Sequence, residues 1–438
     1  LDAFAPLADE PHAILLHAGE AASDPGWSVL VAFPTTTLAV REGATEIDGS
    51  RVAVEPLDAL RALLAARRGA SLRPSGAPFA TGLVGHIGYE MGAAIEPTAR
   101  GPQSPYAFAD MEFGAYDAAA LFDRKARRAF IVGRSPAVMA RLGEALGRRA
   151  APPPSPIASR LAGAEAGGRR HQAAVAEAIE RIRAGDFFQA NLAQTLAFES
   201  ATPIDAFAVF RRLSESDAPF GAYLRRREGA VLSASPERFF ALRPEFGGTR
   251  LLAEPIKGTR ARGPSPDIDR AAAESLLASA KDRAENIMIV DLTRNDLARV
   301  CRDGSITEPE ICGLRSFSTV HHLVSTVSGV LRPDCDFVDA LTALFPCGSI
   351  TGAPKVEAMK AIAALEGRGR GPYCGAIGWI GDDGAADLSV AIRTILIEGS
   401  RAFAPVGGGV TLRSEPSAEL EETLDKAKTA RVALGEAS

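Results

Sequence analysis

Strand-like and helix-like segments follow one another along this chain without the regular alternation that a parallel βαβ sheet needs. Short apolar runs predict strands, and longer segments with apolar residues three or four positions apart predict helices. Helices are expected at 57–68, 136–149, 171–184, 267–301 (one or two helices) and 417–434. Strands are expected at 28–33, 130–132, 187–198, 221–240, 376–380, 388–398 and 406–412. This order predicts an α+β fold, with helices and strands mixed and with sizeable antiparallel sheets.

A segment rich in proline, glycine and alanine interrupts the chain at 150–168, and this composition is typical of a linker. We therefore divide the sequence into an N-terminal segment, 1–149, the linker, and a C-terminal segment, 169–438. At roughly 100–200 residues per domain, 438 residues allow two to four domains or one large core.

Charge and cysteine content exclude several classes of protein. The formal net charge is −5 and the isoelectric point is about 5.8, without a basic arm, which disfavours nucleic-acid binding. No run of 18 apolar residues occurs, so no membrane-spanning helix is expected, and residues 1–4 lack the features of a signal peptide. The five cysteines are irregularly spaced, which indicates free thiols in a reducing cytoplasm and neither disulfides nor a zinc site.

Two acidic pairs stand at helical spacing. Glu419 and Glu422 share one helix face with Lys426, and Asp282 and Glu285 have the same three-residue spacing. Mg²⁺ prefers carboxylate and water oxygens, so two such pairs that face one another would form a magnesium site. The alternative interpretation is that both pairs lie on ordinary solvated helix faces.

Glycines and a turn point to a small anionic ligand. Gly407, Gly408 and Gly409 allow the backbone to approach a ligand closely and to present its N–H groups to an anion. The 345–355 segment lacks the GxxxxGK[ST] spacing of a phosphate loop, so a tight turn with a helix that begins near Pro354 is expected. The hydroxyl of Thr351 remains available to a small ligand. The alternative is a simple structural turn.

Isolated polar residues in apolar surroundings are candidates for chemistry. Burial of Lys257 in its turn would lower the pKa of the amine and make it a nucleophile, although a solvated lysine is the commoner case. Glu237 follows a predicted strand and is a candidate general acid. Arg393 among apolar neighbours is suited to binding an anion, and His322 is most simply a packed histidine.

Taken together and in this order, these segments resemble the chorismate-utilising enzymes over nearly the whole chain. The resemblance is carried by 13–19, 113–117, 188–194, 235–238, 255–260, 284–297, 322–325, 348–355, 373–378, 389–394, 407 and 419–426. It implies a single large fold in which two antiparallel sheets pack face to face as a sandwich with helices outside. The linker would then separate two stretches of sequence and not two independently folding domains.

Two positions distinguish branches of this family. Members that add water to chorismate carry a lysine base where this chain has Gln189, so hydroxylation is disfavoured. Anthranilate-forming members carry alanine where this chain has Lys257. The resemblance therefore implies amination of chorismate to 4-amino-4-deoxychorismate, a precursor of 4-aminobenzoate and folate. The alternatives are an anthranilate-forming subunit and a non-catalytic chorismate-binding regulator, which is expected to have lost Lys257, Glu237 or a metal ligand.

The resemblance also implies roles for individual residues. Lys257 would attack ring carbon C2 and Glu237 would protonate the departing C4 hydroxyl, with Gln189 and His322 among the catalytic residues. Mg²⁺ would bind Glu285 and Glu422, with Asp282 and Glu419 holding metal-bound waters. The substrate-binding set implied is Gly258, Thr259, Thr351, Tyr373, Arg393, Gly407, Gly408, Gly409 and Lys426.

The resemblance further implies a partner. The sequence offers neither a cysteine in a nucleophile-elbow setting nor the roughly 200 extra residues of a glutaminase domain, so a separate glutaminase subunit is expected to supply ammonia. The chain departs from the family at Arg413, where an acidic residue is usual. Residues 15–19 lack the Leu-Leu-Glu-Ser pattern of tryptophan-inhibited members, so tryptophan inhibition is not expected.

Overall fold

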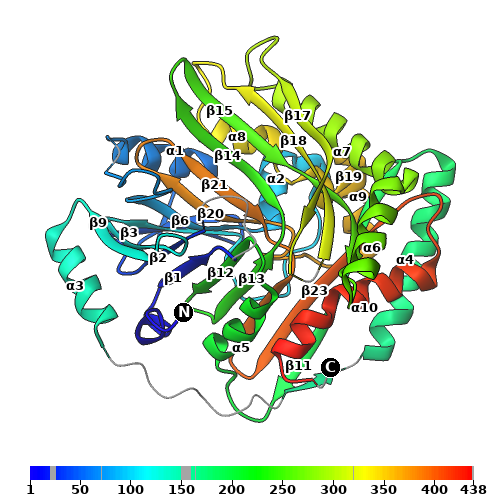
Figure 1. Cartoon of the computed structure of the whole chain (residues 1–438), viewed down its shortest axis with the longest axis horizontal. Helices are drawn as coiled ribbons and strands as arrows, with labels where there is room; N and C mark the ends of the chain where they lie inside the picture. The colour runs from blue at the N-terminus through cyan, green and yellow to red at the C-terminus, as the bar shows by residue number, and fades with distance from the viewer. Residues whose placement is uncertain (20–25, 71, 149–158, 163, 319, 437–438) are drawn as a thin grey trace.

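Two large antiparallel sheets form the centre of the computed structural model, which describes residues 1–19, 26–70, 72–148, 159–162, 164–318 and 320–436 (Figure 1). The first sheet runs in the order β10 (Ser159–Ala162), β11 (Gln189–Ser200), β23 (Arg401–Val410), β22 (Thr394–Glu398), β13 (Ala230–Ser235), β12 (Phe220–Arg225), β1 (Ile14–His17), β2 (Trp27–Val31), β8 (Ala118–Asp123) and β9 (Arg128–Gly133). Short β19 (Gly352–Ala353) pairs with β11.

The second sheet runs in the order β16 (Ile256–Ala261), β18 (Val320–Val330), β15 (Gly248–Glu254), β14 (Arg238–Glu245), β21 (Ala386–Val390), β20 (Ala376–Gly381), β6 (Gly82–Ile87), β7 (Met111–Tyr116), β3 (Thr36–Arg41), β4 (Ala44–Ile47) and β5 (Ser50–Val52). Strand β17 (Thr307–Ser316) pairs with β18. The antiparallel α+β expectation is confirmed.

Strands from both halves of the sequence share each sheet. In the first sheet β1 pairs with β12, with Ile14 opposite Leu224, and in the second sheet β6 pairs with β20, with Ile87 opposite Ala376. The two halves therefore contribute to one fold. Of the expected linker, 150–158 and 163 lie outside the described residues. Residues 159–162 form the edge strand β10, and the next helix begins at Ala164.

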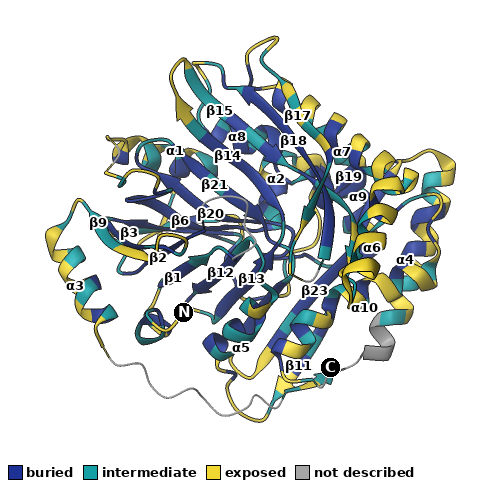
Figure 2. Ribbon diagram, viewed as in Figure 1, coloured by how far each residue is buried: buried dark blue, intermediate teal, exposed yellow. Residues whose placement is uncertain are grey.

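The ten helices of the described part cover the outer faces of the two sheets, whose strands are mostly buried (Figure 2). They are α1 (Pro56–Arg67), α2 (Gly92–Ile95), α3 (Pro136–Leu146), α4 (Ala164–Ala184), α5 (Ala206–Leu213), α6 (Pro266–Ala278), α7 (Ala280–Ala298), α8 (Phe337–Leu344), α9 (Lys355–Glu366) and α10 (Pro416–Ala433). None of them combines the length and the apolar character that crossing a bilayer requires.

The three largest apolar clusters of the described residues hold the layers together. One lies between the sheets and joins Val29 and Leu396 of the first sheet to Val84 and Trp379 of the second. A second packs α1, α7 and α8 on the outer face of the second sheet, and a third packs α3, α5 and α10 on the first. Burial of apolar area is the main driving force for this layering. The expected sandwich with outer helices is therefore confirmed.

The strand predicted at 388–398 is interrupted in the structure. Strand β21 ends at Val390 in the second sheet, and β22 begins at Thr394 in the first sheet. Arg393 lies in the crossing with φ +53°, in the left-handed region. The apolar run continues through the crossing because it is buried in both sheets, so the sequence pattern gives no sign of the break.

Candidate active site

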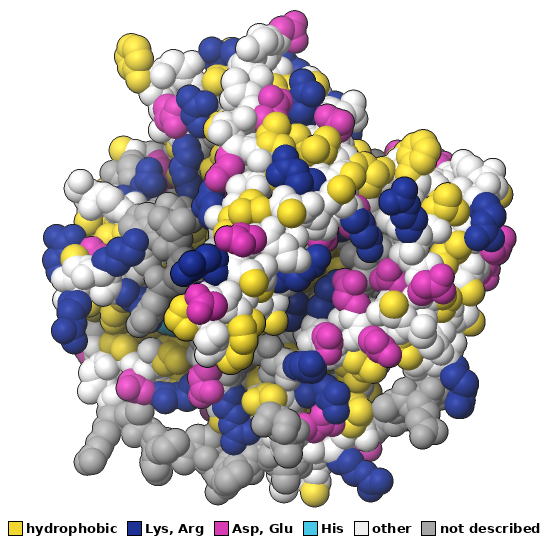
Figure 3. All heavy atoms as spheres, turned by 45° about the vertical axis from the view of Figure 1, so that its right-hand side comes forward, with side chains coloured by type: hydrophobic (Ala, Val, Ile, Leu, Met, Phe, Trp, Pro, Cys, Tyr) yellow, Lys and Arg dark blue, Asp and Glu magenta, His cyan; other side chains and the backbone are white. Residues whose placement is uncertain are grey.

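A cavity of about 600 Å³ opens beside this crossing. Its walls come from β16, β18 and β23, from helices α7 and α10, and from the loops that follow β13 and precede β19. Figure 3 shows Lys, Arg, Asp and Glu side chains interspersed over the side of the molecule that carries α6, α7 and α10. A cavity with charges of both signs suits a polar, charged ligand.

Most residues that the sequence analysis selected line this one cavity. They are Glu237, Lys257, Gly258, Thr259, Asp282, Glu285, His322, Tyr373, Arg393, Gly407, Gly409, Glu419, Glu422 and Lys426. Residues that lie 189 positions apart in the sequence, from Glu237 to Lys426, are thus brought together. Gly408, Gln189 and Thr351 are not among the residues that form the cavity wall.

Lys257 projects from β16, and its Nζ donates a hydrogen bond to the main-chain oxygen of Ser349 over 2.9 Å. Burial lowers the pKa of this amine, and the negative charges of Glu285 and Glu237 oppose the shift. A lysine with a lowered pKa spends more time as the neutral amine, which is the nucleophilic form.

Glu237 lies in the short connection between β13 and β14 with only 3% of its surface exposed. Burial raises the pKa of its carboxyl group to about 7, against hydrogen bonds from Ser349 and from the N–H of Ile256, the latter 3.2 Å from Oε1. A carboxyl group with this pKa is partly protonated at neutral pH and can act as a general acid.

His322 lies on β18, and its Nδ1 is 2.9 Å from the hydroxyl of Thr259 on the paired strand β16. Burial and the nearby charge of Arg393 lower the pKa of the imidazole to about 4. His322 is therefore neutral at physiological pH and offers hydrogen bonds without charge.

Four carboxylates face the cavity from α7 and α10, and each has a partner. Asp282 bonds Arg260 over 2.9 Å, Glu285 lies 3.8 Å from Lys281, and Glu422 lies 2.6 Å from Lys426. Glu419 accepts a hydrogen bond from Ser414 over 2.6 Å, while its buried Oε2 has no hydrogen-bond partner among the described residues.

The donor set fits Mg²⁺. Burial, with added repulsion from Glu422, raises the pKa of both Glu285 and Glu419, and it outweighs the opposing positive charge of the nearby lysines. The described residues contain no ready-made cluster of three ligating side chains. Mg²⁺ does not require one, because it is commonly held by one or two carboxylates together with waters and oxygens of the substrate.

The glycines of β23 keep space beside these groups. A Cβ on Gly409 would lie 2.5 Å from Gln189 Nε2 and 3.5 Å from Lys257 Nζ. A Cβ on Gly407 would lie 2.8 Å from Asn191 Oδ1 and 3.1 Å from the Tyr373 hydroxyl. A side chain at either position would fill the space in which a ligand meets these groups.

The predicted site residues that do not line the cavity are Gln189, Gly408 and Thr351. Gln189 is buried behind Gly409, and its Oε1 has no partner in the described structure. Gly408 lies against the carboxylate of Glu419, because a Cβ there would be 3.0 Å from Oε2. Thr351 is fully buried and its hydroxyl donates to the main-chain oxygen of Cys347 over 2.9 Å, and a contact of this hydroxyl with a ligand stays a prediction.

Asn191 and Ser349 are among the lining residues that the sequence analysis did not select. Asn191 on β11 is 8% exposed, and its Oδ1 has no hydrogen-bond partner within the described part of the chain. Ser349 contacts Lys257 through its main chain. A main-chain contact leaves no side-chain signature in the sequence. Asn191 lies two residues after Gln189, so their shared strand face was the one available signal.

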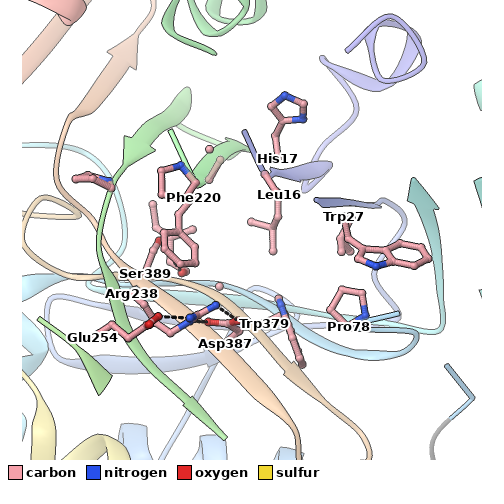
Figure 4. A pocket seen from close by; sticks show the side chains of 18 of the residues that line it. Leu16, His17, Trp27, Pro78, Phe220, Arg238, Glu254, Trp379, Asp387 and Ser389 are labelled. Atoms are coloured by element: carbon pink, nitrogen blue, oxygen red, sulfur yellow. Dashed lines mark hydrogen bonds and ion pairs between the residues drawn. The ribbon is translucent and has the colours of Figure 1, made fainter. Parts of the chain in front are cut away.

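A second cavity, of about 530 Å³, lies between the sheets (Figure 4). Leu16, His17 and Trp27 line it from the first sheet, and Arg238 and Trp379 line it from the second. It shares part of its wall with the first cavity, through Pro219, Pro236, Ile256 and Phe317. Arg238 is held there between Asp387, at 2.9 Å, and Glu254.

The fold, with a lysine and four carboxylates around one cavity, agrees with the family that the sequence comparison finds. The model of the family described as chorismate binding enzyme matches residues 16–431. This chain therefore belongs to the chorismate-binding enzyme family.

Two curated relatives and one solved structure are similar to this chain over most of its length. The chain is 37% identical over 433 residues to aminodeoxychorismate synthase component 1 of Salmonella typhimurium, covering 97% of this chain and 93% of that protein. It is 35% identical over 443 residues to anthranilate synthase component 1 of Thermus thermophilus, with the same coverage. The crystal structure of anthranilate synthase component I from Streptococcus pneumoniae superposes with a TM-score of 0.81 at 29% identity, over 92% of each chain.

Proposed function

We propose that this chain is the synthase subunit of an aminodeoxychorismate synthase and converts chorismate and ammonia to 4-amino-4-deoxychorismate. The observation that carries the proposal is the position of Lys257, an amine with a lowered pKa, in the same cavity as the carboxyl group of Glu237. The name of the Salmonella typhimurium relative supports it.

The proposed reaction has two displacements. The neutral amine of Lys257 attacks C2 of chorismate, the ring double bonds shift, and the bond from C4 to its hydroxyl breaks. Glu237 gives its proton to that hydroxyl, which leaves as water, and the attacking nitrogen loses a proton. Ammonia then attacks C4, the double bonds shift back, and Lys257 departs from C2 and takes up a proton. Two displacements place the new amine at C4 and keep the enolpyruvyl group.

The two carboxylates of the substrate would bind at opposite ends of the cavity. Arg393, Tyr373 and the amides of Gly407 and Gly409 would hold the enolpyruvyl carboxylate. Arg393 is positioned for this by a hydrogen bond from its Nη1 to the main-chain oxygen of Lys426, over 2.9 Å.

Glu285 and Glu422 would hold Mg²⁺, and Asp282 and Glu419 would hold its waters, at the end of the cavity that takes the ring carboxylate. The ion would supply positive charge for that carboxylate. Burial of Glu285 and the unpartnered Oε2 of Glu419 support this assignment.

Ammonia would come from a separate glutaminase subunit in the cytoplasm. The relatives named component 1 support the existence of a second component. Free ammonium at high concentration should replace this partner in a test of the isolated chain.

Anthranilate synthesis is the second candidate. The Thermus thermophilus relative is named anthranilate synthase component 1 and is within two percentage points of identity of the Salmonella typhimurium relative. Overall identity thus does not separate the two activities. The presence of Lys257 favours the aminodeoxychorismate reaction, because an amine at C2 leaves C4 as the position that ammonia attacks.

A covalent adduct tests the proposal. The chain is incubated with chorismate and Mg²⁺ in the absence of ammonia, and its intact mass is measured. We expect the mass to increase by chorismate less one water, with the modification mapped to Lys257, and no increase in Lys257→Met. An unmodified mass, together with turnover on addition of ammonium, would contradict the role of Lys257.

A further inference from the structure

Ser349 lies in the short 3₁₀ turn Gly348–Ile350, between the two groups to which the proposed function gives the chemistry. Only 4% of the residue is exposed. Its main-chain oxygen accepts the hydrogen bond from Lys257 Nζ, 2.9 Å away, and its hydroxyl lies close enough to the carboxyl group of Glu237 to oppose the rise in the pKa of that group. One residue therefore contacts the nucleophile through its backbone and the acid through its side chain.

We propose that Ser349 is a positioning residue that holds Glu237 and Lys257 in their working arrangement, its hydroxyl orienting the acid and its main-chain oxygen orienting the amine. The proposal rests on the proposed function, because that function assigns proton donation to Glu237 and attack to Lys257.

The surroundings of Ser349 allow its hydroxyl to donate to Glu237. Cys347 Sγ lies 3.3 Å from Ser349 Oγ, and burial raises the pKa of this thiol to about 12, so it keeps its proton. The thiol can donate to Ser349 Oγ, which leaves the Ser349 proton for Glu237. The turn itself is fastened by the Thr351 hydroxyl, which donates to the main-chain oxygen of Cys347.

The consequence concerns the acid after it has given up its proton. The carboxylate of Glu237 then accepts two hydrogen bonds, from Ser349 and from the N–H of Ile256. Hydrogen bonds to a charged acceptor are stronger than those to a neutral one, so they favour the ionised form and assist proton transfer to the leaving hydroxyl. The backbone bond to Lys257 does not depend on the side chain at 349.

Ser349→Ala removes the hydroxyl and keeps the main-chain oxygen. We expect kcat to fall roughly tenfold, as for loss of a hydrogen bond to a charged group. The alkaline limb of the pH profile of kcat/KM, which reports Glu237, should move up by about one pH unit. The KM for chorismate and the Mg²⁺ requirement should stay unchanged. Ser349→Cys, with a weaker donor, should shift the limb less and remains informative if the alanine variant folds poorly.

Two matched variants separate positioning from a general effect of lost packing. Cys347→Ser keeps a donor to Ser349 and should preserve the pH profile. Ser389→Ala removes an equally buried hydroxyl that bonds only the main-chain oxygen of Ile377 among the hydrogen bonds of the described structure, and should leave the limb in place.

A uniform fall in kcat/KM at every pH for Ser349→Ala and Ser349→Cys, with an unmoved alkaline limb, would overturn the proposal, and so would unchanged activity. Failure of the proposed function gives a different result, because the unmodified chain would then form another product or none. If the unmodified chain forms anthranilate, the shift of the Glu237 limb is measured on that reaction.

Discussion

Arg370 and Glu366 form an ion pair that is almost fully buried and that joins three segments of the chain beside the cavity. Glu366 accepts the Ala193 N–H over 2.8 Å, and Arg370 donates to the main-chain oxygens of Ile350 at 3.1 Å and Asn191 at 2.6 Å. The pair therefore links the end of α9 to β11 and to the turn that carries Ser349.

Replacement of Arg370 by leucine should destabilise the protein strongly. It leaves the carboxylate of Glu366 buried without its partner, which typically costs about 3–5 kcal/mol. The free energy of unfolding from urea titration measures the loss. Lys360→Met provides the control, because it removes an exposed ion pair to Glu357 and should change stability by less than about 1 kcal/mol. Equal small effects of both variants would contradict the role of the buried pair.

The plot of kcat/KM against pH should be bell-shaped. The active form carries a neutral Lys257, which becomes more abundant as pH rises, and a protonated Glu237, which is lost as pH rises through about 7. His322, with a pKa of about 4, should contribute nothing between pH 6 and 9. The measurement is kcat/KM at a constant concentration of unprotonated ammonia. A rate that keeps rising above pH 8 would exclude Glu237 as the acid.

Neutralisation of the carboxylates should weaken the dependence on Mg²⁺. In Glu285→Gln and Glu422→Gln one charged ligand is lost, so the Mg²⁺ concentration for half-maximal activity should rise at least tenfold, as for loss of about 1.4 kcal/mol of binding. Glu421→Gln is the matched control, because Glu421 is exposed on the same helix and does not line the cavity. An unchanged Mg²⁺ titration in both glutamine variants would contradict the assignment.

A methyl group at Gly409 should impair catalysis more than folding. The added Cβ would lie 2.5 Å from Gln189 Nε2, so Gln189 must shift, and with it the surroundings of Lys257. We expect Gly409→Ala to lower kcat/KM at least tenfold while the thermal midpoint falls by a few degrees, for a cost of about 1 kcal/mol or more. Gly69→Ala is the comparison, since the nearest atom to its Cβ is 3.8 Å away. Similar activity of both variants would contradict the close approach.

Much of the fold could be predicted because its helices have clear boundaries. The 267–301 segment separates into α6 and α7 at Ser279, whose hydroxyl accepts the N–H of Asp282 and so caps the second helix. The change of sheet at Arg393 could not be predicted, because periodicity records burial and does not record which sheet a strand joins.

Part of the candidate site could likewise be predicted from the sequence, and part of it could not. Lys257, Glu237 and the acidic pairs stand out because polar side chains interrupt apolar segments. Ser349 contacts Lys257 through its main-chain oxygen, and Thr351 turns its hydroxyl inward to Cys347, so only the three-dimensional structure shows how these two residues differ. The second cavity has walls from both sheets, and no local sequence pattern predicts it.

The product formed from chorismate, Mg²⁺ and ammonium by the purified chain tests the central claim most directly. Mass spectrometry and absorbance identify the product, and a coupled assay measures pyruvate. We expect 4-amino-4-deoxychorismate without pyruvate, and no product from Lys257→Ala. Anthranilate with an equal amount of pyruvate would contradict the account and assign the anthranilate reaction to this chain.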